Sequence, residues 1–339
     1  MEYLEIKDSK AFNFTITYSL LTKKKIKINI LSGFEYKEDY VRLVCSITKG
    51  SSYEFDKKTS ILLFNPGVLI GGRFIYTCKD EISNYIVPLL PALPFNGSQI
   101  FISFIGVTNN LHSVEMIKIA HFTLCKHFEI PGLELVVKKT GFSPEGQGQA
   151  DLFCGSMSQI KNIDLSQPSE LDKTRALLLS SRLNSNCIGE MSSVVTDLLG
   201  DLNLKIFSNV HNSKDSGPSP GYQCNLFMES KEGIFYAIKL GLDSAPREVV
   251  HETCLELLKS ANRGGVLDEK LYPLLFSFLA ISSTDISSVV ISRITEETDV
   301  IIKLVRIFFN YEFVLSKLND ELLLKSSGCG YKNINRKIN

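Results

Sequence analysis

The stretch KKTGFSPEGQGQAD, residues 138–151, decides how the rest of the chain is interpreted. It lies between two strand-like runs, residues 133–137 and 151–154, so it joins strands that are close in sequence. Three glycines and a proline allow backbone N–H groups to converge without side chains in the way. Such a loop can hold a phosphate, although the same composition is typical of an ordinary β-turn. The candidate anion contacts in this loop are Gly141, Gly146 and Gly148.

Length and composition indicate a chain with a sizeable core and no bulk charge. With 339 residues, 44% of them hydrophobic, two domains are expected. The formal net charge is zero, so any contact with nucleic acid has to come from a local basic patch. The eight cysteines form no C-x-x-C pair, which favours buried thiols over a metal site. No apolar run reaches the roughly 18 residues of a membrane span, so no membrane contact is expected.

Hydrophobic periodicity predicts an alternation of strands and helices along the chain. Alternating elements of this kind form layered sheets covered by helices. The predicted helices include residues 40–48, 192–199, 246–261, 271–280 and 299–309. The predicted strands include residues 60–64, 99–106, 176–183, 204–207, 222–229, 233–241 and 322–325. Between them, the polar stretches 166–170 and 212–221 are the clearest loops.

Three blocks of sequence resemble a known family. The 138–151 loop resembles the signature Arg/His-Gly-x-x-Pro-x-Gly-Gly-Gly of the RNA 3'-terminal phosphate cyclase family, with Gly146-Gln147-Gly148 in place of the three glycines. Residues 65–72 (NPGVLIGG) and 219–222 (SPGY) are similar to the cyclase-like branch of that family, which works in ribosome assembly. The resemblance implies an α/β (α+β) fold, with repeated β-α-β-α-β-β units forming a large domain, residues 1–175 and 265–339. A small α/β domain, residues 176–264, is expected as an insertion.

The residues that catalysis in this family depends on are missing at the corresponding places. The family's cyclases attach the adenylyl group to a histidine shortly before a late helix, where this chain has residues 294–298, ITEET. They also open with a glycine-rich loop, whereas residues 8–13 here read DSKAFN and no glycine precedes Gly33. Side chains at these positions would obstruct the approach of a phosphate. We therefore expect no cyclase activity and no nucleotide cofactor.

A second activity proposed for the cyclase-like branch is cleavage of precursor ribosomal RNA by an Arg-Asp-x-Lys cluster. In this chain the aligned residues are Lys303, Leu304, Val305 and Arg306. Leucine can neither take a proton nor orient a base, so general acid–base cleavage would lack its carboxylate. A carboxylate from residues 296, 297 or 299 could replace it in space. Lys303 and Arg306 lie one turn apart and could hold phosphates, or could form an ordinary solvated helix face.

The resemblance and these departures from it lead to one expectation and two alternatives. We expect a non-catalytic ribosome-assembly factor of the nucleolus, which acts on small-subunit precursor rRNA together with a ribosome-assembly GTPase and the box C/D small nucleolar RNP. The alternatives are an endonuclease of precursor rRNA and an RNA-end cyclase with a displaced nucleophile. The candidate RNA or anion contacts are Arg73, Gly141, Gly146, Gly148, Arg293, Lys303 and Arg306.

Overall fold

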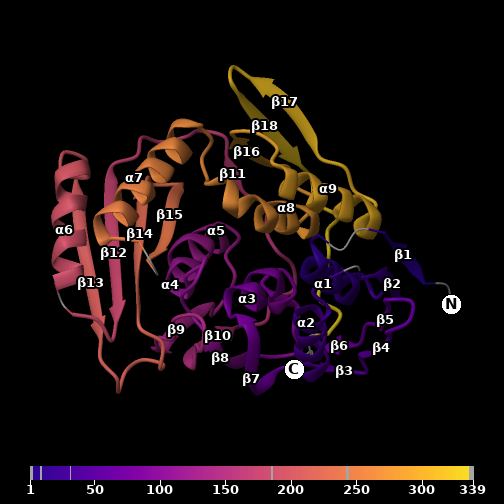
Figure 1. Cartoon of the computed structure of the whole chain (residues 1–339). Helices are drawn as coiled ribbons and strands as arrows, with labels where there is room; N and C mark the ends of the chain where they lie inside the picture. Colours follow the sequence, from indigo (N-terminus) through magenta and orange to yellow (C-terminus); the bar gives the residue numbers. More distant parts are fainter. Residues whose placement is uncertain (1–2, 8–9, 31, 185, 242–243, 336–339) are drawn as a thin grey trace.

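The computed structural model describes residues 3–7, 10–30, 32–184, 186–241 and 244–335. Within these ranges the chain folds into three β-α-β-α-β-β repeats and one further four-stranded unit (Figure 1). In every repeat the first two strands are parallel and the others are antiparallel. The three sheets share one strand order, β1-β2-β5-β4, β7-β8-β10-β9 and β11-β16-β18-β17. The α+β fold with repeated units, expected from the sequence, is confirmed.

The first repeat is formed by the N-terminal part of the chain. It contains β1 (Leu4–Ile6), α1 (Phe12–Thr22), β2 (Ile26–Asn29), α2 (Phe34–Ser46), β4 (Ser52–Asp56) and β5 (Ile61–Asn65). A small ribbon of β3 (Thr48–Lys49) and β6 (Val68–Leu69) closes it.

The second repeat contains the 138–151 loop. Its elements are β7 (Gly72–Glu81), α3 (Ser83–Leu89), β8 (Ile100–Val107), α4 (Val114–Met116), α5 (Phe122–His127), β9 (Glu134–Lys139) and β10 (Gly148–Cys154). A 3₁₀ turn, Leu93–Phe95, follows α3, and a π-helical turn, Ile117–His121, joins α4 to α5. The helical segment that ends at His127 therefore contains one wider turn, which is a feature often found at functional sites.

The third repeat is interrupted by the fourth sheet. It contains β11 (Asp164–Leu165), a 3₁₀ turn (Glu269–Leu271), α8 (Tyr272–Ile281), β16 (Ser287–Ile291), α9 (Glu296–Phe309), β17 (Val314–Leu318) and β18 (Glu321–Ser326). Between β11 and α8 lie β12 (Lys173–Ser181), α6 (Asn186–Leu199), β13 (Leu204–His211), β14 (Gly221–Glu229), β15 (Ile234–Gly241) and α7 (Pro246–Asn262). These strands pair in the order β13-β12-β14-β15.

Two hydrophobic cores hold these units. The larger core joins the helix-covered faces of the three repeats, and its fully buried rings include Tyr18, Tyr40 and Phe276. The smaller core lies between the fourth sheet and helices α6 and α7, where Met191, Cys224 and Leu257 are buried. The fourth sheet also contributes Phe227, Ile234 and Tyr236 to the larger core, so apolar contacts join this unit to the repeats. Among the described residues no helix is long and apolar enough to cross a bilayer.

Several predicted elements have different bounds in the structure. The helix predicted over residues 40–48 is α2, which begins six residues earlier, after Gly33 in a left-handed conformation. Prediction missed β16, in which two serines precede only three β-branched residues, and β17, which is exposed along its whole length. The helix predicted from residue 246 is confirmed as α7, with Pro246 in its first turn, where the missing N–H costs no hydrogen bond.

A central cleft and the predicted contact residues

A cleft with a volume of about 940 Å³ lies where the three repeats and the fourth sheet meet. Its walls come from the N-terminal ends of α1, α2, α3, α4, α8 and α9 and from β15. Helix N-termini carry partial positive charge and unsatisfied N–H groups, so their convergence is favourable for an anion. The side chains at these ends decide whether this chain makes use of that property.

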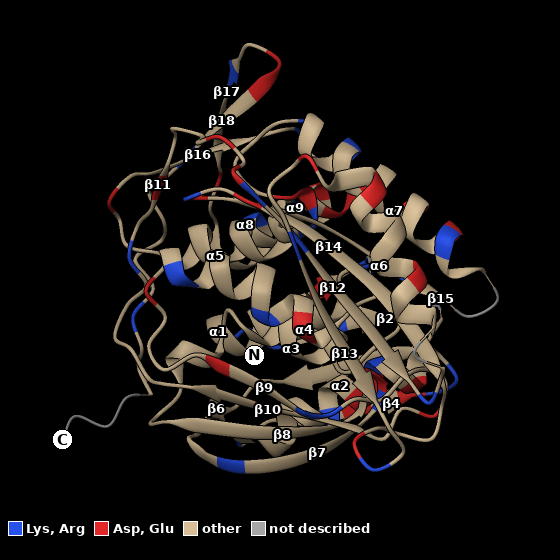
Figure 2. Cartoon of the chain, turned by 90° about the vertical axis from the view of Figure 1, so that its left-hand side faces the viewer, with Lys and Arg blue, Asp and Glu red and all other residues tan. Residues whose placement is uncertain are grey.

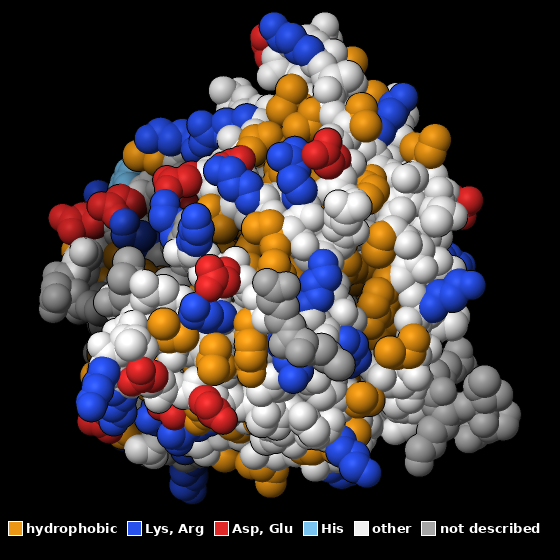
Figure 3. Space-filling view, turned by 90° about the vertical axis from the view of Figure 1, so that its right-hand side faces the viewer, with side chains coloured by type: hydrophobic (Ala, Val, Ile, Leu, Met, Phe, Trp, Pro, Cys, Tyr) orange, Lys and Arg blue, Asp and Glu red, His pale blue; other side chains and the backbone are white. Residues whose placement is uncertain are grey.

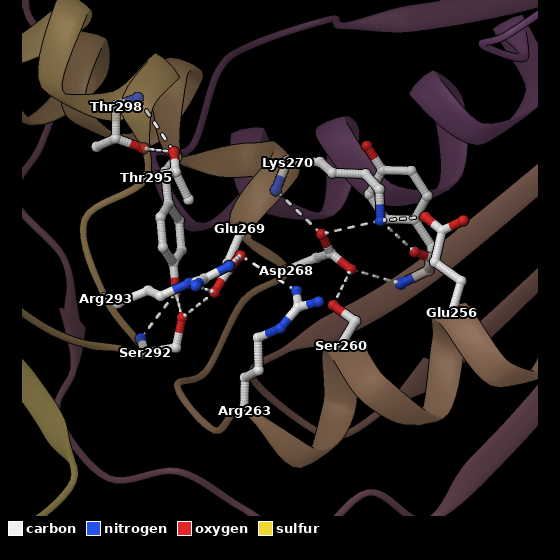
Figure 4. Close-up of polar contacts among 12 residues, drawn as sticks. Glu256, Ser260, Arg263, Asp268, Glu269, Lys270, Ser292, Arg293, Thr295 and Thr298 are labelled. Carbon is white, nitrogen blue, oxygen red and sulfur yellow. Dashed lines mark hydrogen bonds and ion pairs between the residues drawn. The ribbon is translucent and has the colours of Figure 1, made fainter.

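The N-terminus of α9 is satisfied by the chain's own side chains. The Thr295 hydroxyl oxygen accepts a hydrogen bond from the Thr298 N–H at 3.1 Å, as seen in Figure 4. Three carboxylates follow in the first turn, and one of them, Glu296, forms a 2.7 Å ion pair with Lys10. A phosphate approaching this helix end would meet these carboxylates before the helix dipole. Residues 8 and 9 of the DSKAFN segment lie outside the described residues.

One histidine lies in the wall of the cleft. His121 ends the π-helical turn, is 8% exposed, and its Nδ1 atom has no hydrogen-bond partner in the described structure. Burial, with a smaller contribution from the nearby His112, lowers the pKa of His121 to about 3. Its ring is therefore neutral at physiological pH and faces Tyr236, with ring centroids 6.2 Å apart. This side chain can offer or accept a hydrogen bond in the cleft, but it does not lie at the cyclase position before α9.

A buried carboxylate connects the fourth sheet to the third repeat beside the cleft (Figure 4). Asp268 is fully buried and accepts hydrogen bonds from the Tyr236 N–H at 3.1 Å, the Ser260 hydroxyl at 2.8 Å and the Lys270 N–H at 3.0 Å. The Lys270 ammonium lies 3.1 Å from Glu256 and points over the Tyr236 ring. The cluster fixes β15, α7 and the start of α8 relative to one another, and its charges are already paired.

Three of the predicted basic contacts are neutralised by carboxylates. Arg293 makes two bonds to Glu269, at 2.9 and 3.1 Å (Figure 4). On α9, the ion pairs are Lys303 with Asp299 at 2.5 Å and Arg306 with Glu312 at 3.0 Å. All three cations are exposed, and Figure 3 shows Lys and Arg interspersed with Asp and Glu on one face of the molecule. Leu304, at the family's acidic position, is 5% exposed and packs into the larger core.

Arg73 differs from the other three basic candidates. It lies on the edge strand β7, is exposed, and its guanidinium lies 5.3 Å from the ring centre of Phe101. Within the described part of the chain no carboxylate lies at ion-pair distance from it. Arg73 therefore lies on a different element from Arg293, Lys303 and Arg306 and, unlike them, is not paired with a carboxylate in the described structure.

The glycine loop is packed against neighbouring backbone. The N–H of Gly141 donates to the Thr108 hydroxyl at 2.8 Å, and the N–H of Gly146 donates to the Phe142 carbonyl at 2.9 Å. Gly148 lies in β10, where it pairs with β8, and all three glycines are buried. A Cβ on Gly141 would lie 2.3 Å from the backbone nitrogen of Gly148, which is too close for any side chain. Glycine is required here because the backbone segments pack closely together. An anion that bound at this loop would have to displace hydrogen bonds that are already made.

Sequence reasoning assigned no role in the site to His121 or Asp268. Neither has a neighbour in sequence that indicates a site, because the π-helical turn and the buried contacts that place them depend on tertiary structure. The alternation in residues 99–106 does place Phe101 on the face opposite the core, but one exposed ring is common and was not a sufficient signal.

Comparison with known proteins identifies the family of this chain. A family described as RNA 3'-terminal phosphate cyclase matches residues 7–315. An RNA 3'-terminal phosphate cyclase-like protein of Homo sapiens is 25% identical over 329 residues, covering 90% of this chain and 88% of the relative. An rRNA processing protein of Saccharomyces cerevisiae is 24% identical over 361 residues, covering 99% and 98%. A probable cyclase-like protein of Dictyostelium discoideum is 26% identical over 371 residues, covering 98% and 99%. The chain therefore belongs to the RNA 3'-terminal phosphate cyclase family and resembles its cyclase-like members.

Proposed function

We propose that this chain is a non-catalytic factor in rRNA processing during assembly of the small ribosomal subunit. The observation that carries the proposal is the first turn of α9. There, threonine and carboxylate side chains are found, and by the family resemblance this is the place where a cyclase carries its nucleophilic histidine. A covalent nucleotidyl intermediate needs a nucleophilic nitrogen at that place, and the side chains of Thr295 and Glu296 do not supply one. The name of the Saccharomyces cerevisiae relative, an rRNA processing protein, supports the cellular process.

The family resemblance also supports a place and partners for this activity. We propose that the chain works in the nucleolus, bound to a ribosome-assembly GTPase and acting on precursor rRNA beside the box C/D small nucleolar RNP. A protein with no net charge that pairs its surface cations suits a role made mostly of protein contacts. RNA contacts would then be local, through the residues that remain unpaired.

The absence of cyclase chemistry is tested by labelling. The purified chain is incubated with ATP radiolabelled at the α-phosphate, beside an active RNA 3'-terminal phosphate cyclase as positive control. We expect no acid-labile label on the chain and no cyclic phosphate on an RNA bearing a 3'-phosphate. A nucleotidylated adduct on the chain would overturn the proposal.

The cellular role is tested by depletion and rescue. Removing the chain from its cells should make small-subunit rRNA precursors accumulate, as measured by pulse labelling of RNA. Because Lys303 and Arg306 are paired with carboxylates, a Lys303→Ala, Arg306→Ala double variant should restore processing and should co-purify with the GTPase. Cleavage of a precursor fragment by the purified wild type, lost in this double variant, would show instead that the chain is an endonuclease.

A further inference from the structure

The second repeat has a sheet face that no other element of the described residues covers. On β8, Ile102 and Phe104 face the core, so Phe101, Ser103 and Ile105 face the other way. On β7, exposed and less exposed residues alternate, and the exposed ones lie on the same side of the sheet as Phe101. In Figures 1 and 2, helices α3, α4 and α5 lie on one side of β7, β8, β10 and β9, and no ribbon covers the other side. We call this uncovered side the β7–β10 outer face.

Two aromatic rings lie side by side on the two central strands of the β7–β10 outer face, near one end of the strands. Phe101 on β8 is directly opposite Phe153 on β10, with ring centroids 4.7 Å apart and planes at 50°. Both side chains are half-buried, and neither belongs to the larger or the smaller core. Arg73, opposite Phe101 on β7, places its cation over that ring. The rings therefore contribute little to the stability of the interior and expose π surface to solvent.

The other two repeats show what such a face looks like without aromatic residues. In the first repeat the outward pairs on the two central strands are Lys27 with Leu63 and Asn29 with Ile61. In the third repeat the pairs at the corresponding positions are Ser288 with Lys325 and Val290 with Leu323, and Val290 is fully buried. Because the three sheets have the same strand order, the aromatic pair is a specific feature of the second repeat and is not required by the fold.

Charged and polar groups surround the aromatic pair. Exposed lysines, Lys79 on β7 and Lys138 on β9, lie on the two edge strands, which also carry the exposed carboxylate Glu134. Beside the rings, the Asp151 carboxylate is 8% exposed and accepts from the Ser103 hydroxyl at 2.7 Å and from the Gln149 amide at 3.2 Å. Glu134 is directly opposite Phe153 on β9 and is exposed, whereas the Asp151 carboxylate two residues along β10 is covered and the Arg73 guanidinium has no carboxylate partner in the described structure.

We propose that the β7–β10 outer face binds single-stranded RNA, with bases stacked on Phe101 and Phe153 and a phosphate held by Arg73. The proposal rests on the proposed role in rRNA processing and names the contact surface. Adjacent aromatic rings on the central strands of a four-stranded sheet can stack successive bases, because every base has a π face. An unpaired cation over one ring suits a phosphate backbone. Ile75 and Ile105 add apolar area to the same face, so the tests below also distinguish RNA from a protein partner.

The chain allows a direct optical test, because it contains no tryptophan. A Phe101→Trp variant has a single indole, placed in the proposed stack, so its fluorescence reports only this face. We expect a short single-stranded oligouridylate to quench the fluorescence, and a duplex RNA of equal length to leave it nearly unchanged. Fluorescence that is equally insensitive to both RNAs would overturn the proposal.

Affinity measurements with matched variants extend the test. Phe101→Leu and Phe153→Leu should each weaken binding of the oligouridylate by about 5- to 100-fold, the range expected for losing one stacked base. Phe101→Tyr keeps the ring and should bind within about twofold of wild type. Arg73→Gln should reduce the dependence of log affinity on log salt by about 0.7. Unchanged affinity in both leucine variants would refute the stacking.

The outcomes separate this proposal from the proposed function. If wild type restores rRNA processing in depleted cells but the purified chain does not bind the oligouridylate, RNA binding by the β7–β10 outer face is refuted and the proposed function stands. If the leucine variants lose a protein partner while keeping RNA affinity, the β7–β10 outer face is a protein contact and the proposal is also refuted. If wild type fails to restore processing, the proposed function itself fails.

Discussion

Replacing Asp268 by alanine should destabilise the whole chain. The substitution leaves three donors without their acceptor, namely the Tyr236 N–H, the Ser260 hydroxyl and the Lys270 N–H. An unsatisfied buried donor costs about 1–3 kcal/mol, and the Ser260 hydroxyl can rotate to find another partner, so we expect a loss of roughly 3–5 kcal/mol. Asp268→Asn keeps the shape and one carbonyl oxygen, and should cost about 1–3 kcal/mol.

The assay is equilibrium unfolding in urea at pH 7, with the free energy of unfolding compared among variants. Asp201→Ala serves as a control, because this carboxylate is exposed just after α6 and its loss should change stability by no more than about 0.5 kcal/mol. Because Asp268 holds two cores together, the alanine variant should also unfold in a broader transition, with the two units separating. A loss below about 1 kcal/mol for Asp268→Ala, or equal losses for alanine and asparagine, would refute this account of the cluster.

Three further predictions concern backbone packing and pH. A Cβ on Gly217 would lie 1.7 Å from a backbone oxygen of the 138–151 loop, so Gly217→Ala should cost 2 kcal/mol or more in urea unfolding, on the order expected for overpacking. Gly189→Ala, in open space on α6, should instead stabilise by up to about 1 kcal/mol. The pKa of His121 is lowered to about 3, so below pH 6.5 the unfolded chain takes up a proton that the folded chain does not. Between pH 6.5 and 5 the free energy of unfolding of wild type should therefore fall by roughly 2 kcal/mol relative to His121→Phe. Parallel curves of unfolding free energy against pH for the two proteins would contradict this. Burial would raise the pKa of Glu269, but hydrogen bonds from Arg293 and Ser292 lower it. The stability difference between wild type and Arg293→Gln should therefore be full at pH 7 and be lost as pH falls through the lowered pKa of Glu269, as measured by urea unfolding over a pH series.

The fold was predictable where local chemistry and tertiary environment agree. Helix α7 was predicted from Pro246 and an amphipathic pattern, and α9 from its apolar stripe, although the prediction began at residue 299 and α9 begins at Glu296. The alternation of strands and helices predicted the layered α/β arrangement, but not the common strand order of the three sheets. Strand order depends on which edges meet in space, and a strand such as β17, with every side chain exposed, has no alternating pattern for the sequence to display.

The candidate site was less predictable, because charge pairing depends on distant residues. Lys303 and Arg306 have the right spacing on one helix face, but the carboxylate beside Arg306 comes from beyond the end of α9. Arg293 meets Glu269, which is separated from it by the whole of α8 and β16. The sequence indicated that cations are present, and only the structure distinguishes those already paired from Arg73.

Triplication gives this chain three sheets built on a single plan. Their inward sides are tied to a common interior, so a substitution there disturbs the neighbouring copies as well. The outward side of the second sheet does not carry this constraint, and it has two aromatic rings where the first sheet has lysine and leucine. Loss of chemistry at the middle of such a molecule would therefore leave its periphery free to specialise, one copy at a time.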